Sequence, residues 1–219
     1  MLKRRKYNRK TVKSVTAPAQ LAVSVADMKT YLRVDTSDDD ALIEDFIESA
    51  TETIKEYLQR ALITETFLLT MDGFNWSDDD YGLSLGAGVH TASVPYQYGW
   101  GDEIDLPYRP IQSITSLKTF NRDNTESTFS ASNYELDEEG GRLYLNEGAT
   151  FPTELRDREA VNVTYVAGYG DNGSDIPKPI TQAIKTYVSK MYDCREVCDM
   201  PKACTMGLAP YKLINLGYF

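Results

Sequence analysis

The sequence predicts an α+β protein in which a set of helices carries an inserted antiparallel β region. Apolar residues recur at three- and four-residue steps over 38–61 and again over 180–192, which is the pattern of helices with one buried face. Between these stretches, short segments alternate apolar and polar residues and are rich in β-branched and aromatic types, as strands are. We therefore expect a helical bundle of a short, a long and a C-terminal helix, with an antiparallel β region at about 63–170.

Residues 1–20 show no hydrophobic period and predict a flexible basic arm. Residues 1–13 carry seven basic residues and no acidic one. Such a cluster can contact phosphates or an acidic partner, and a solvated tail is the alternative. The candidate contact residues are Lys3, Arg4, Arg5, Lys6, Arg9 and Lys10.

Two helices follow the arm and open the main domain expected over 21–207. Ser24, with Asp27 three residues later, fits the capping pattern of a short helix at about 24–33. After a polar turn, three aspartates begin a longer helix at about 38–60, where negative charge suits the positive end of the helix dipole. The polar residues between its apolar positions predict an outward face, formed by Glu44, Glu48, Glu52, Lys55, Glu56 and Gln59.

The β region contains several predicted strands and one long insertion. Residues 63–74, 111–120 and 161–170 alternate as strands do, and a Gly-Gly turn at 139–141 predicts a hairpin. The insertion 75–102 is rich in Gly and aromatic residues, and loops of this length are usually functional. No Lys or Arg occurs from 75 to 105, which argues against base stacking and favours contact with another protein or a neighbouring copy. The candidate contact residues are Trp76, Tyr81, Tyr96, Tyr98 and Trp100.

The C-terminal part is predicted to contain a helix at about 179–194 and a docking tail at 208–219. The helix needs a partner for its apolar stripe, and we expect it to pack against the long helix of 38–60. The tail is apolar and aromatic and contains no acidic residue, so it can dock into a groove or add a strand to a partner.

Composition limits the classes of function. The 219 residues carry a net charge of −10, and the chain beyond the basic segment has 16 basic and 33 acidic residues. A protein whose main part is this acidic repels nucleic acid over most of its surface. No run of 18 apolar residues suggests a membrane span, and no apolar segment follows the charged N-terminus, so we expect synthesis in a cytoplasm without a secretory signal.

The sequence offers no catalytic constellation, and we expect no catalytic residue, bound metal or cofactor. His90 is the single histidine, and the glycine motifs that bind nucleotide phosphates are missing. Cys194, Cys198 and Cys204 lack the paired spacing of a zinc ribbon and would need His90 as a fourth ligand. A small metal-binding enzyme built on these residues, or a weak cation site at Asp78–Asp80, remains a minor alternative.

Three stretches together resemble the head–tail connector proteins of tailed bacteriophages, also called adaptor or head-completion proteins. Residues 24–67 resemble the opening of that family, a short helix ending in YLRV, an acidic turn and a long helix that leads into a strand. The segment LPYRPIQSITSLKTF (106–120) and the segment 161–197, which begins VNVTYVAGYG, resemble later family motifs in the same order. The insertion 75–102 and the basic arm are departures from the family pattern.

The resemblance implies a non-enzymatic ring, commonly of twelve copies, below the portal of the virion. Such a ring extends the DNA channel, touches genomic DNA without specificity, and offers a platform for a downstream neck, stopper or tail protein. It also implies assembly in the host cytoplasm and a portal contact through the C-terminal tail, here Tyr211, Lys212, Leu213, Ile214, Leu216, Tyr218 and Phe219.

Within such a ring, the outward face of the long helix would line the channel or meet the next subunit. The residues concerned are Glu44, Glu48, Glu52, Lys55 and Glu56. A nucleic-acid-binding accessory protein that acts through the basic arm is the principal alternative function.

Overall fold

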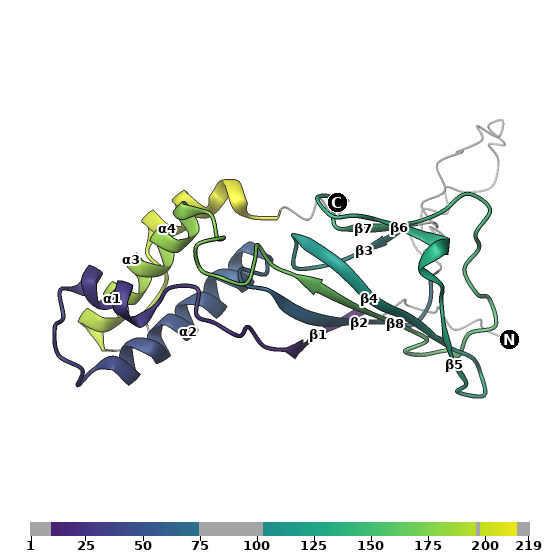
Figure 1. The fold of residues 1–219 in the computed structure, drawn as a ribbon, viewed down its shortest axis with the longest axis horizontal. Helices are drawn as coiled ribbons and strands as arrows, with labels where there is room; N and C mark the ends of the chain where they lie inside the picture. The colour runs from purple at the N-terminus through teal and green to yellow at the C-terminus, as the bar shows by residue number, and fades with distance from the viewer. Residues whose placement is uncertain (1–9, 75–102, 196–197, 214–219) are drawn as a thin grey trace, which may run out of the picture.

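A computed structural model describes residues 10–74, 103–195 and 198–213. The molecule is elongated, with its helices gathered at one end and its sheets at the other (Figure 1). The predicted α+β class is confirmed, since helices and antiparallel sheets both form in one chain.

The helical end contains the three predicted helices and a fourth, short one. The expected ranges 24–33, 38–60 and 179–194 agree with the observed helices to within two residues. The short helix is capped as predicted, because the Ser24 hydroxyl accepts a hydrogen bond of 3.1 Å from the backbone N–H of Asp27. The helices are α1 (Val25–Leu32), α2 (Asp40–Leu58), α3 (Lys178–Cys194) and α4 (Lys202–Leu208), the last followed by a 3₁₀ turn at Ala209–Tyr211.

One hydrophobic cluster joins the four helices. Ile47 and Ile54 of α2 and Ile184 of α3 are fully buried in it, so the expected packing of these two helices is confirmed. The helices run antiparallel, since the Tyr192 hydroxyl near the end of α3 donates a 2.6 Å hydrogen bond to the Asp39 carboxylate just before α2. Burial of these apolar stripes supplies the main stabilisation of the helical end.

The sheet end is built from two antiparallel sheets. The larger has the strand order β1-β2-β8-β4-β5, and the smaller has the order β3-β7-β6. They enclose a second hydrophobic cluster that includes Leu69 of the large sheet and Leu143 of the small one. The strands are β1 (Lys10–Thr16), β2 (Glu65–Met71), β3 (Glu103–Asp105), β4 (Ile111–Phe120), β5 (Glu126–Thr128), β6 (Tyr134–Asp137), β7 (Arg142–Leu145) and β8 (Val161–Ala167).

The expectation that residues 1–20 form a flexible arm is wrong for 10–16. These residues form edge strand β1, which pairs antiparallel with β2 and places Val12 opposite Leu69. Little alternation is visible in this segment because it is an edge strand, and its last four residues are exposed. Residues 1–9 and the insertion 75–102 lie outside the described residues.

The two ends of the molecule are joined where the chain passes from α2 to β2 and returns from β8 to α3. Backbone hydrogen bonds link the two connections, with Thr64 N–H donating to Gly170 over 2.9 Å and Tyr169 N–H to Leu62 over 3.3 Å. Gly168 has φ 138°, and a Cβ there would lie 2.5 Å from the carbonyl oxygen of Ile63. Glycine is therefore required both by conformation and by the close approach of the second connection.

We predict that Gly168→Ala lowers the free energy of unfolding by about 1–3 kcal/mol, because the new methyl group meets backbone and φ is unfavourable. Thermal or urea denaturation measures the loss. Gly207→Ala in α4 is the matched control, since a Cβ there meets nothing within 4 Å. Equal stability of the two variants would contradict this account of the junction.

Candidate assembly surfaces

The outward face of α2 carries a row of four glutamates. Glu44, Glu48, Glu52 and Glu56 are all exposed and lie four residues apart, one above the other along the helix. Like charges at this spacing repel one another by about 0.2–0.5 kcal/mol per pair. Within the described residues, Glu44 and Glu48 have no ion-pair partner. The row therefore presents largely uncompensated negative charge at the surface.

Lys55, which was expected on this outward face, is buried instead, and that expectation is wrong. It is 7% exposed, and its ammonium group lies 3.0 Å from the Oε2 atom and 3.2 Å from the Oε1 atom of Glu65 on β2, itself 3% exposed. A second ion pair of 3.2 Å reaches exposed Glu52. The helix turns Lys55 toward the sheet because its position borders the apolar stripe beside Leu58.

Aromatic rings surround the ion pair. Phe67 of β2 stacks on Tyr108 with ring centroids 4.8 Å apart, and the Lys55 ammonium lies 5.6 Å and 5.7 Å from the two centroids. The Tyr108 hydroxyl donates a 2.8 Å hydrogen bond to the Glu56 carboxylate. Lys55 is thus tied to β2 through Glu65 and Glu56 to the loop between β3 and β4 through Tyr108, while Glu52 pairs with Lys55 on the same helix.

The junction shifts the pKa of both Lys55 and Tyr108. Desolvation by burial lowers the pKa of Lys55, but the hydrogen bonds and charges of Glu65 and Glu52 together outweigh it, and the net pKa is raised. Desolvation raises the pKa of the Tyr108 phenol to about 12, and its hydrogen bond to Glu56 adds to the increase. Both shifts favour the protonated forms in the folded protein.

The beginning of the predicted docking tail packs on the protein's own helical end. Leu208 is fully buried there, the Tyr211 carbonyl accepts a 2.6 Å hydrogen bond from Arg60, and Leu213 N–H donates to the Leu58 carbonyl over 3.1 Å. The Lys212 ammonium lies 4.5 Å from the centre of the Tyr57 ring. The segment 208–213 is therefore held against the end of α2. Ile214, Leu216, Tyr218 and Phe219 lie outside the described residues.

The other predicted site residues are only partly described. Lys10 of β1 is the one member of the predicted basic contact set within the described residues. Burial lowers its pKa, and the charges of Asp105 and Glu103 act to raise it. Trp76, Tyr81, Tyr96, Tyr98 and Trp100 all fall in the part of the chain that is not described, as do His90 and Asp78–Asp80.

The three cysteines have different environments. Cys194 is exposed, Cys198 is half-buried, and Cys204 is buried with its thiol 3.6 Å from the Ala183 carbonyl. Burial raises the pKa of the Cys204 thiol, which keeps it protonated. Within the described ranges, no three His, Cys, Asp or Glu side chains gather as metal ligands.

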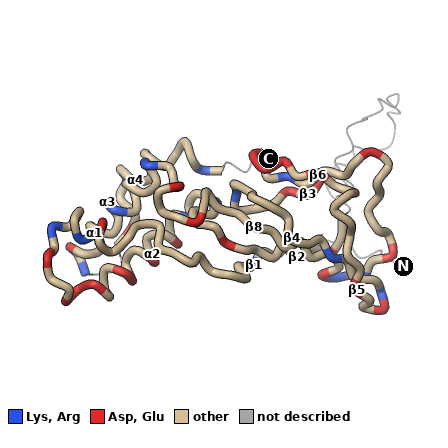
Figure 2. Tube along the Cα trace, viewed as in Figure 1, with Lys and Arg blue, Asp and Glu red and all other residues tan. Residues whose placement is uncertain are grey.

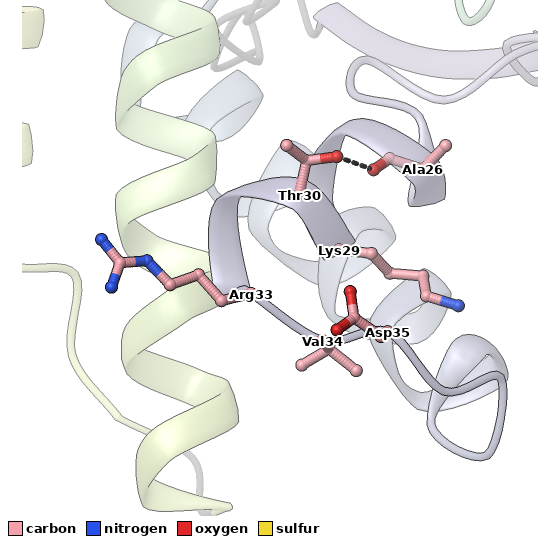
Figure 3. A pocket seen from close by; sticks show the side chains of 6 residues that line it. All are labelled: Ala26, Lys29, Thr30, Arg33, Val34 and Asp35. Carbon is pink, nitrogen blue, oxygen red and sulfur yellow. Dashed lines mark hydrogen bonds between the residues drawn. The ribbon is translucent and has the colours of Figure 1, made fainter.

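A hollow at the end of α1 offers little to a small ligand. Ala26, Lys29, Thr30, Arg33, Val34 and Asp35 line it. Figure 3 shows Lys29 and Arg33 pointing in different directions, while the Thr30 hydroxyl bonds back to the Ala26 carbonyl over 3.0 Å. Lys29 is also held by an ion pair of 2.6 Å to Asp40. Polar groups that converge on one point, as binding sites require, are missing among these lining residues.

Sequence reasoning missed the partners that the sheet supplies at the junction. Glu65 could have been found from its position, because it shares the inward alternation of Phe67, Leu69 and Met71. A carboxylate at an inward position must be paired with a cation. The sequence does not reveal that Lys55 is this cation or that Tyr108 covers it.

We predict that Lys55→Met lowers the free energy of unfolding by about 3–5 kcal/mol, because it leaves the buried Glu65 carboxylate without a counter-ion. The double variant Lys55→Met/Glu65→Leu should recover most of this loss. Urea denaturation measures both, and Glu44→Gln on the exposed face is the neutral control. A double variant as unstable as the single one would contradict the assignment.

We predict that stability falls as the pH rises from about 10 to about 12, since both raised pKa values belong to the folded state. The unfolded chain loses these protons first, so the stabilisation is complete below about pH 10 and is lost as the pH passes the folded pKa values. Denaturant midpoints at about pH 8 and about pH 11 should differ less in Tyr108→Phe than in wild type. The control Tyr144→Phe should behave as wild type, and an unchanged pH dependence in Tyr108→Phe would contradict the role of the phenol.

Comparisons with known proteins identify the family. Residues 22–137, more than half of the chain, match the model of the phage gp6-like head–tail connector proteins. A search of curated proteins found no match. No described helix is long and apolar enough to cross a membrane.

Solved structures share the fold across nearly the whole chain. A protein in the neck of an empty gene transfer agent particle, computed with C6 symmetry, superposes with a TM-score of 0.71 and 21% identity, covering 94% of this chain and 96% of that one. A chain from the virion of the native particle superposes with a TM-score of 0.69 and 21% identity, covering 93% of this chain and 96% of that one. A chain from the native neck computed with C12 symmetry also gives a TM-score of 0.69 and 21% identity, covering 94% of this chain and 96% of that one. The chain belongs to the phage gp6-like head–tail connector family.

Proposed function

We propose that the protein forms a closed ring in the neck of a tailed-phage particle, below the portal, where it extends the DNA channel. The family match over residues 22–137 is the observation that carries this proposal. The fold likeness to proteins from particle necks that were computed with C6 and C12 symmetry supports a ring, and twelve copies is the number we favour.

The charge of the protein suits a channel through which DNA must move. The chain has a net charge of −10, and the exposed row on α2 concentrates negative charge on one surface. Such a surface repels the phosphate backbone, so contact with genomic DNA is transient and non-specific. The role is structural rather than enzymatic, and the ring also offers a platform to a downstream neck, stopper or tail protein.

The portal contact is assigned to the end of the chain. Residues 208–213 are anchored on the helical end through Leu208, Tyr211 and Leu213, so the point to which the last six residues are attached is fixed. Residues 214–219, with the sequence INLGYF, are apolar and aromatic and carry no charged side chain. A short apolar segment on a fixed anchor can fill a groove on a partner at a low cost in conformational entropy.

We predict that removing residues 214–219 abolishes or strongly weakens portal binding without unfolding the protein, because the cut leaves the anchor at 208–213 intact. Co-sedimentation of the purified chain with assembled portal measures binding, and thermal denaturation checks the fold. Met206→Ala, at a side chain that is 77% exposed, is the control that should bind as wild type. Undiminished binding by the shortened chain would rule out the tail as the portal contact.

A further inference from the structure

The helical end has two outward faces of opposite charge. The buried stripes of α2 and α3 face each other across one hydrophobic cluster, so the exposed sides of these two helices point in opposite directions. α2 contains six acidic residues and one Lys, and that Lys is buried. α3 contains three Lys and one acidic residue, Asp193, near its end.

The basic face is formed by the outward side of α3. Lys178 and Lys185 lie opposite the buried stripe of α3, with the polar side chains of Gln182 and Ser189 on the same side. Lys202 of α4 carries a positive charge on the other flank of α3, where Cys204 of α4 contacts the Ala183 carbonyl, so it lies outside this face. Within the described residues, none of these three lysines has a carboxylate partner within ion-pair distance. Asp27 of α1 lines the same hollow as Lys178 and Lys185 without pairing with them.

The two faces lie on opposite sides of the molecule and have similar lengths. Figure 2 shows Asp and Glu positions along α2, and Lys and Arg positions near α3 and α4 with a few acidic ones among them. The row from Glu44 to Glu56 extends over about 18 Å, and the face from Lys178 to Ser189 over about 17 Å. Each face is therefore a strip of comparable size and opposite sign.

These strips cannot neutralise each other within one copy, because the hydrophobic cluster separates them. In a closed ring each subunit uses two different surfaces, one toward each neighbour. Complementary strips on opposite sides of one subunit meet this requirement. We propose that the acidic strip of α2 in one copy docks on the basic strip of α3 in the next copy; this rests on the ring of the proposed function.

The chemistry of the contact is set by its exposed location. The glutamates of α2 and Lys178 are exposed and Lys185 is half-buried, so single ion pairs between the strips are weak and salt-sensitive, and several must act together. Their main effect is to orient neighbouring copies head to tail, since acidic-to-acidic and basic-to-basic contacts are repelled.

Charge reversal of each strip tests the proposal. Glu44→Lys/Glu48→Lys changes two glutamates that have no ion-pair partner in the described part of the chain, and it leaves Glu52 and its contact with Lys55 intact. Lys178→Glu/Lys185→Glu changes the opposite strip. The yield of rings from each variant should be lower than that of wild type by about tenfold or more, both for the chain alone and on the portal. Native mass spectrometry and negative-stain images measure this yield. Glu138→Lys/Glu139→Lys, in the β6–β7 turn, is the charge-matched control and should assemble as wild type.

Variants in which the two contacting strips again have opposite charge should recover assembly. A chain with both strips reversed again has opposite strips and should form rings of wild-type yield. The two single-strip variants, mixed in equal amounts, should assemble with each other but not alone. Wild-type rings can also be assembled from a mixture of isotope-labelled and unlabelled chains and treated with a carbodiimide, a zero-length cross-linker. Links between a labelled and an unlabelled copy should then join Lys178 or Lys185 of one copy to Glu44, Glu48 or Glu52 of the other.

The outcomes separate this contact from the ring itself. Rings that form normally in both single-strip variants and give no such cross-link overturn the proposed contact and leave the proposed ring standing. Failure of the doubly reversed chain to regain assembly, with its fold intact by circular dichroism, also overturns the contact. A wild-type chain that forms no ring, alone or on the portal, overturns the proposed function and the contact together.

Discussion

The buried ion pair between Lys55 and Glu65 is the constraint on which the arrangement of the two ends of the molecule depends. It joins the last turns of α2 to the first residue of β2 and is enclosed by Phe67 and Tyr108. A buried charge is costly unless it is paired, so any rotation that separated helix from sheet would leave two uncompensated charges. The backbone hydrogen bonds between the two connections, and the close approach at Gly168, add a steric restraint to the electrostatic one.

A fixed angle between helices and sheets matters for the proposed ring, in which each subunit repeats around a circle. Small errors in the orientation of one copy add up over the circumference, so closure requires a rigid body. Two hydrophobic clusters, one at each end, would by themselves allow hinge motion between them. The polar junction removes this freedom, and residues 208–213 are anchored beside it through Arg60 and Tyr211. The surfaces that we propose for neighbours and for the portal are thereby held in one rigid body.

Much of the fold could be predicted from the sequence wherever a strong period was present. The apolar stripes of α2 and α3 and the alternation of β4 are local signals, and the predicted strand 111–120 agrees with the observed β4. Strand β1 escaped prediction because an edge strand buries little, and α4 because seven residues give barely two turns. Lys55 was misplaced because its side chain lies at the border of the buried stripe, where only the residues of the sheet decide which way it turns. The charge asymmetry between α2 and α3 could be counted from the sequence, but its meaning depends on the packing that places the two outward faces on opposite sides.

A single cryo-EM reconstruction of the neck, with the protein assembled on its portal, tests the central claim most directly. The account predicts a closed ring in which each copy keeps the helix–sheet orientation set by Lys55 and Glu65, the strip of Glu44 and Glu48 faces α3 of the next copy, and residues 214–219 contact the portal. Isolated copies around the portal, or a ring in which the helical ends do not touch, would contradict it.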